Sequence, residues 1–149
     1  MRTLSFVVFC SLFILISGCG KAGPAVNPVS GTITFDGKPL DGASVRFTPK
    51  SQGTGELAAG STDASGNLTG VKTLSTGDPG IVAGDYTVTV SKMVSKPSNQ
   101  TYTKPETGEV IKVTSSEETV PVNYTNIGKS PLSAAIQKGE NKLTLEVKK

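Results

Sequence analysis

The chain has 149 residues, contains no histidine and only two cysteines, and carries a formal net charge of +3 from 15 basic and 12 acidic residues. Without histidine, a Ser-His-Asp triad, a Cys-His pair and any histidine-containing metal site are excluded. The lysines are scattered rather than clustered, so the charge indicates neither nucleic acid nor an acidic ligand. We therefore predict no catalytic residues, no metal site and no cofactor.

The N-terminus reads as an export signal. A short positive start at Arg2 precedes an apolar run, Leu4 to Ile16, that is too short to serve comfortably as a transmembrane anchor. The run ends in Ile16-Ser17-Gly18-Cys19, which resembles a bacterial lipobox. The resemblance implies a signal peptide over 1–18, cleavage between Gly18 and Cys19, and lipidation of Cys19. An ordinary secretory signal with an incidental cysteine is the alternative.

The mature protein is then expected to sit on a membrane without spanning it, because the lipid on Cys19 supplies the anchor. Cys10 lies in the removed segment and Cys19 is blocked by lipid, so no disulfide can form within one mature chain. Residues 19–28 have the small and proline-containing composition of a tether. Gly20 after the lipidated cysteine, by resemblance to sorting in diderm bacteria, favours the outer over the inner membrane. The predicted location is the bacterial cell envelope.

The 131 residues that remain after cleavage before Cys19 suffice for one domain, and the first strand signals follow the tether at once. From Val29 to Phe35 apolar and polar residues alternate, and Ala43, Val45 and Phe47 repeat the pattern. Asp36-Gly37-Lys38-Pro39 and Asp41-Gly42 supply turn residues between them. These residues predict a hairpin that opens a β-sandwich.

Further strands are expected along the chain. A weak strand over Leu57 to Thr62 leads into a tight turn at 63–67, which we expect the Asp63 side chain to cap. A calcium loop is the alternative there, although the spacing fails the EF-hand template. A short strand is expected over Leu68 to Leu74. A clear strand follows over Asp85 to Ser91, with Tyr86, Val88 and Val90 facing the core.

The C-terminal part completes the pattern. One strand face is formed by Leu132, Ala134 and Ile136, and a turn follows at 138–141. In the last strand Leu143, Leu145 and Val147 are expected to face inward. The domain predicted over 29–149 is therefore an all-β sandwich with Phe47 and Tyr86 as core residues.

The order of these blocks resembles that of the carboxypeptidase regulatory-like domain, a transthyretin-like fold. The blocks are Val29 to Phe35, Gly37 to Pro49, Thr62-Asp63 with Gly66, and Gly84 to Val90. The C-terminal part resembles a group of small bacterial lipoproteins that carry this domain, through Pro121, Tyr124, Ser130-Pro131-Leu132, Ile136, Gly139, Asn141 and Leu145. The resemblance implies a seven- or eight-stranded Greek-key β-sandwich of the transthyretin or prealbumin type. The peptidase zinc site belongs to another domain, so the resemblance implies no enzyme.

The stretch 93–119 is longer than a connection between two sandwich strands needs. Lys104 to Gly108 could turn a small ribbon whose second arm is Val110 to Thr114. Tyr102, Val110, Ile111 and Val113 are the candidate contacts to a protein partner, whereas the polar composition of the stretch favours a solvated excursion with no partner. Two function classes follow: a non-catalytic accessory or protein-contact module of the cell envelope, or a domain that binds glycan or peptide. The low aromatic content favours the first.

Overall fold

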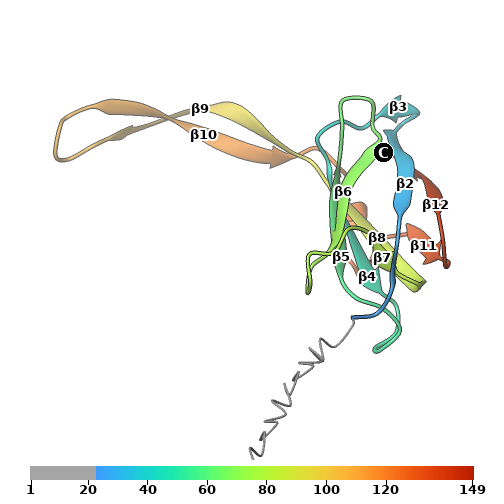
Figure 1. Cartoon of the computed structure of the whole chain (residues 1–149). Coiled ribbons are helices and arrows are strands. Elements are labelled where there is room, and N and C mark those ends of the chain that lie inside the picture. The colour runs from blue at the N-terminus through green and yellow to red at the C-terminus, as the bar shows by residue number, and fades with distance from the viewer. Residues whose placement is uncertain (1–22) are drawn as a thin grey trace, which may run out of the picture.

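The computed structural model describes residues 23–149, and this part of the chain is almost entirely β (Figure 1). The predicted all-β sandwich is confirmed, while the Greek-key connection of its strands stays a prediction. The signal peptide, the cleavage site at Gly18 and Cys19, and the lipidation of Cys19 lie outside the described residues. Within residues 23–149, no helix has the length and apolar character needed to cross a bilayer.

Two sheets form the sandwich. The larger sheet has five strands in the spatial order β11 (Ser133–Ile136), β8 (Gly84–Ser91), β4 (Ser44–Pro49), β5 (Ala58–Thr62) and β6 (Leu68–Thr73). The smaller sheet has the order β12 (Asn141–Val147), β2 (Val29–Phe35) and β3 (Lys38–Pro39). The C-terminal strand β12 pairs in parallel with β2, whereas the other neighbours are antiparallel. The one helix of the described part is the single turn α1 (Val122–Thr125).

The core lies between the sheets and is built from the predicted alternating positions. Phe47, Tyr86, Val88 and Val90 are fully buried, and the rings of Phe47 and Tyr86 meet edge to face at 6.4 Å. The hydroxyl of Tyr86 donates a hydrogen bond of 2.7 Å to the carbonyl of Val82, so its one polar atom is satisfied. The prediction that both aromatic residues belong to the core is confirmed.

The expected opening hairpin is wrong, because β2 and β4 belong to different sheets. The chain turns at Asp36 and Gly37, both with positive φ, and pairs β2 with the two-residue strand β3 instead. Leu40 is then buried, and a second turn at Gly42 sends the chain across to the larger sheet. The two turns follow one another, so β2 and β4 lie in different sheets. Each strand therefore packs its apolar face on the core from the opposite side.

The folded domain begins before Val29. Residues Val26–Asn27, which the sequence assigns to the tether, form β1 and pair with β7 (Ile81–Val82). The Asn27 side chain is buried, donates to the carbonyl of Ile81 at 3.2 Å and accepts from the amide of Gly139 at 2.9 Å. These bonds tie Asn27 to β7 and to the turn at Gly139, so Val26 and Asn27 belong to the folded domain.

The turn at 63–67 is built as the sequence predicts. One carboxylate oxygen of Asp63 accepts from the amides of Ser65 and Asn67, each at 2.8 Å. The other accepts from the Asn67 side chain at 3.1 Å. These hydrogen bonds lower the pKa of Asp63, with the Asn67 amide contributing most. The carboxylate therefore caps the turn itself.

Candidate functional site

The most prominent surface feature is a two-stranded ribbon formed by β9 (Met93–Thr103) and β10 (Val110–Glu118). The second arm, β10, continues to Glu118, beyond the end at Thr114 that the sequence predicts. A turn closes its tip, where the amide of Gly108 donates to the carbonyl of Lys104 at 2.9 Å. Figure 1 shows the ribbon projecting away from the two sheets, with only its base near them. Its backbone hydrogen bonds form locally, and most of its side chains on both faces are exposed.

The four expected contact residues all lie on this ribbon near its outer half. Tyr102 and Ile111 are direct cross-strand partners, so their side chains share one face. Val110 is opposite Thr103 and lies on the other face. Val113 has no partner, because the register shifts between Lys112 and Thr114. Tyr102 and Val110 are 55% and 61% exposed, and Ile111 and Val113 are also exposed. The structure therefore brings Tyr102 and Ile111 together and separates Val110 from them.

The base of the ribbon is fixed by Glu118, which the sequence analysis did not single out. Its carboxylate accepts hydrogen bonds from the amide of Lys92 at 2.8 Å, from the amide of Val120 at 3.0 Å, and from the hydroxyl of Ser91. Beside it, the amide of Thr119 donates to the carbonyl of Lys92 at 2.9 Å. We call Glu118 with Ser91, Lys92 and Val120 the carboxylate clamp. Its partners lie up to 27 residues away along the chain, so no local sequence pattern indicates it.

The clamp is strongest when Glu118 is ionised. Partial burial alone would raise the pKa of Glu118, but the hydrogen bonds from Ser91, Val120, Lys92 and Thr119 together outweigh it and lower the pKa. A carboxylate that accepts several hydrogen bonds is stabilised in its charged form. The ribbon base is thus held by a charged group at neutral pH.

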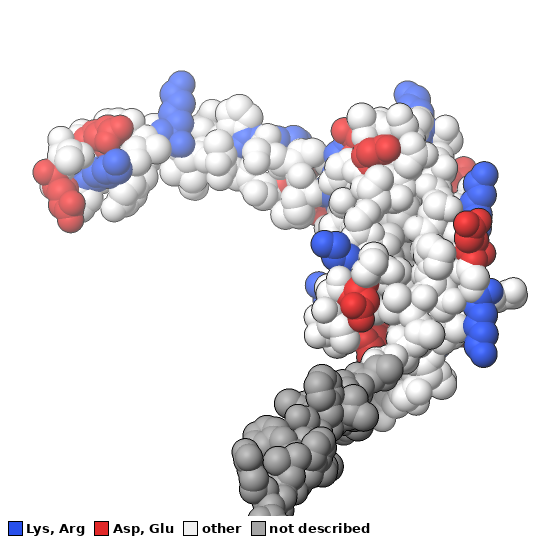
Figure 2. Space-filling model, viewed as in Figure 1, with Lys and Arg blue, Asp and Glu red and all other residues white. Residues whose placement is uncertain are grey.

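The charges along the ribbon are mostly paired. Lys104 contacts Glu109 at 2.9 Å near the tip, Lys96 contacts Glu117, and Lys92 contacts Asp41 at 2.5 Å at the base. Figure 2 shows charges of both signs at the tip and a largely uncharged shaft interrupted by a few basic side chains. The ribbon surface therefore presents neither a basic nor an acidic stripe.

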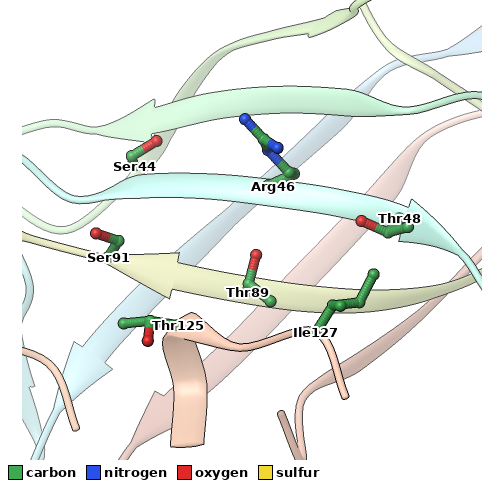
Figure 3. A pocket seen from close by; sticks show the side chains of 7 residues that line it. All are labelled: Ser44, Arg46, Thr48, Thr89, Ser91, Thr125 and Ile127. Atoms are coloured by element: carbon green, nitrogen blue, oxygen red, sulfur yellow. The ribbon is translucent and has the colours of Figure 1, made fainter. Parts of the chain in front are cut away.

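A second feature is a polar hollow on the outer face of the larger sheet. It has a volume of about 420 Å³ and is lined by Ser44, Arg46, Thr48, Thr89, Ser91, Thr125 and Ile127. Figure 3 shows side chains from β4 and β8 on its floor, with Thr125 and Ile127 at one side. Arg46 has no carboxylate within ion-pair distance in the part of the chain that the structure describes. The hollow thus combines five hydroxyl groups with one unpaired cation, which suits a polar or anionic molecule.

The hollow offers little for nucleophilic chemistry. Ser91 is its only hydroxyl that donates to a carboxylate, that of Glu118, among the described residues. A general base works best with a pKa near the operating pH, whereas the hydrogen bonds of the clamp lower the pKa of Glu118. The Ser91–Glu118 pair is therefore better suited to holding the ribbon base than to activating a nucleophile.

Exposed aromatic platforms are scarce in the described part of the chain. Tyr86 is buried, and Tyr124 packs against the core while its hydroxyl accepts from the amide of Lys148 at 3.1 Å. Phe47 is buried, and Phe35 packs against the core. Tyr102 is the remaining aromatic residue, and it stands alone on the ribbon. Stacking of a sugar between several aromatic rings is therefore not available in residues 23–149.

Comparison of the chain with protein-family models, with curated proteins and with solved structures finds no match.

Proposed function

We propose that this protein is a non-catalytic, membrane-anchored lipoprotein whose β-sandwich carries the ribbon as a contact arm for another protein of the cell envelope. The observation that supports the proposal is the ribbon itself. It exposes Tyr102, Val110, Ile111 and Val113 far from the core, while the carboxylate clamp fixes its base. Exposed apolar side chains on a projecting, anchored element are typical of recognition sites, because apolar surface is unfavourable in water and a bound partner can cover it.

The anchor is proposed from the sequence. The short apolar run that ends at Ile16-Ser17-Gly18-Cys19 and the resemblance to small lipoproteins with a carboxypeptidase regulatory-like domain support lipidation of Cys19 and placement in the envelope, with the outer membrane favoured. Metabolic labelling with an alkyne fatty acid tests this. We expect labelling and membrane fractionation of the full chain, and loss of both in Cys19→Ser. Unchanged labelling in Cys19→Ser would contradict the anchor.

Contact through the ribbon is tested by photo-crosslinking in cells. A photoreactive amino acid replaces Tyr102 in the full chain, and the matched control replaces the exposed Lys142 on β12 of the sandwich. We expect a discrete cross-linked protein from position 102 and none from position 142. Equal cross-linking from both positions, or none from position 102, would contradict the ribbon as the contact arm.

A second candidate function is binding of a glycan or peptide in the polar hollow. Arg46 and the surrounding hydroxyl groups of Ser44, Thr48 and Thr89 favour it, because a guanidinium and several hydroxyls bind carboxylates and polar groups well. A glycan array probed with the full chain and with Arg46→Ala tests this candidate. Binding that Arg46→Ala abolishes would support it, and an array without signal would leave the contact arm as the proposed function.

A further inference from the structure

The two outer edges of the ribbon differ, and this difference points to how a partner would bind. In the described part of the chain β9 and β10 pair only with each other, so each has one edge without a neighbouring strand. Such an edge presents backbone donors and acceptors that another strand can pair with. Which groups face outward follows from the hydrogen bonds at the two ends of the ribbon.

These end bonds set the alternation along β10. At the tip, the amide of Lys104 donates to the carbonyl of Glu109 at 2.9 Å. At the base, the amide of Thr119 donates to the carbonyl of Lys92, also at 2.9 Å. In an antiparallel pair, hydrogen-bonded and non-hydrogen-bonded residues alternate, and the latter point their N–H and C=O groups away from the partner. Both ends agree that the outward residues of β10 are Val110, Lys112, Thr114 and Ser116.

The edge of β9 is blocked at its centre. Pro97 lies opposite Thr114, so it occupies an outward position, where proline has no N–H to offer. Next to it, Ser98 to Gln100 bulge out, since three residues of β9 face only Val113 of β10. Proline and bulges are the usual protection of a strand edge. The edge of β10 has neither, and its residues are rich in the β-branched types that pair well.

Charge identifies the kind of strand that fits. Among the described residues, Lys92, Lys96 and Lys104 each have a carboxylate partner, whereas Lys112 in the middle of the open edge has none. The acidic residues of β10 in a second copy of this chain are already engaged, because Glu117 contacts Lys96 and Glu118 is held in the clamp. Opposite charges across neighbouring strands stabilise pairing, and like charges oppose it.

We propose that the edge of β10 takes an extended segment of a partner protein by strand addition, with an acidic residue opposite Lys112 and apolar residues beside Ile111 and Val113. Backbone hydrogen bonds to Lys112 and Thr114 hold the segment, and the alternation of acidic and apolar side chains selects it. This inference rests on the proposed function, because it names the edge and the partner chemistry of the same contact arm.

The test uses a fluorescently labelled peptide of about seven alternating valines and glutamates, titrated into the detergent-solubilised full chain and followed by anisotropy. We expect saturable binding that Lys112→Glu weakens about tenfold. A peptide with lysines in place of the glutamates should bind Lys112→Glu better than it binds the unaltered chain. No saturable binding up to about 1 mM peptide would overturn the proposal.

A matched proline pair tests which edge is used. Thr114→Pro removes an outward N–H from β10, and Ser95→Pro removes one from β9, opposite Ser116. The native Pro97 shows that the ribbon accommodates proline at such a position. We expect Thr114→Pro to abolish peptide binding and Ser95→Pro to leave it unchanged, with circular dichroism showing that both fold. Equal effects of the two variants would overturn the proposal.

Two further outcomes separate this inference from the proposed function. If the Tyr102 position still cross-links a protein in cells while the peptide does not bind, the contact arm stands and strand addition fails. If neither occurs, both fail. The variant Val113→Cys tests whether a second copy of the chain binds at this edge. More disulfide-linked dimer in this variant than in the unaltered chain would identify the chain itself as the occupant. That result would overturn the choice of an acidic partner segment.

Discussion

Apart from the parallel pair β2 and β12, the sandwich is built from antiparallel strands, as the ribbon is, yet only the sandwich shows the alternation of apolar and polar residues. In β8 the side chains of Tyr86, Val88 and Val90 are buried and those between them are not, because one face packs on the core. In β10 nearly every side chain is exposed on both faces. Period-two alternation therefore indicates the burial of one face, and a strand can form without it where a partner strand and a fixed base are present.

The largest difference between the two regions is expected for their aromatic residues. Phe47→Ala empties a fully buried site against Tyr86 and should lower the free energy of unfolding by about 3–5 kcal/mol. Tyr102→Ala, on the exposed ribbon, should change it by less than about 0.5 kcal/mol. Urea unfolding followed by circular dichroism measures both. Similar effects of the two variants would mean that the ribbon packs as tightly as the core.

A pair of glycines should give the next largest contrast. Gly66 in the Asp63 turn and Gly108 at the ribbon tip both have positive φ, which costs an alanine about 1–2 kcal/mol. At Gly66 an added Cβ would also lie 2.6 Å from the carbonyl oxygen of Ile33, whereas at Gly108 nothing lies within 4 Å. Gly66→Ala should therefore destabilise the protein by roughly 2–4 kcal/mol and Gly108→Ala by only about 1–2 kcal/mol. Equal destabilisation in thermal melts would contradict the packing at the turn.

The carboxylate clamp should give a smaller and local effect. Glu118→Gln removes the charge that accepts from Ser91, Lys92 and Val120, so hydrogen exchange at the Lys92 and Val120 amides should become faster while the core amides stay protected. Glu117→Gln breaks only the exposed pair with Lys96 and should change little. Unchanged exchange in Glu118→Gln would show that the carboxylate does not hold the base.

The same clamp makes the ribbon base dependent on pH. Because the pKa of Glu118 is lower in the folded protein than its usual value of 4.5, the contribution of the clamp is fully present above that value. It is lost as the pH falls through the lowered pKa, since the protonated carboxyl accepts these bonds less well. In hydrogen-exchange measurements at different pH values, the protection of the amides at the ribbon base, relative to their intrinsic exchange rates, should therefore fall only in acid. Glu118→Gln should not show this fall.

Sequence patterns were informative where one face of a strand is buried and uninformative where contacts join distant segments. The strand at 29–35 has the predicted bounds, and the core role of Phe47 and Tyr86 is confirmed, because each depends on local alternation. The hairpin was predicted wrongly, since two successive turns can either pair neighbouring strands or send them to opposite sheets. Pairing of β1 with β7 and the role of Glu118 depend on residues far apart in the chain, and no local pattern indicates them.

Even removing the ribbon altogether is expected to have only a small effect on the sandwich. Replacing residues 95–116 by a short Gly/Ser linker keeps Glu118 and its partners and deletes side chains that contribute nothing to the core. Since loop closure depends only weakly on length, the free energy of unfolding of the sandwich should stay within about 1 kcal/mol of that of the unaltered protein.

Urea unfolding of this ribbon-replacement variant is the most direct test of the sandwich as a self-contained scaffold and the ribbon as an arm that it carries. We predict a cooperative transition with nearly unchanged midpoint. A variant that is unfolded, or less stable by about 3 kcal/mol or more, would show that the ribbon belongs to the structural core and would contradict its role as an arm.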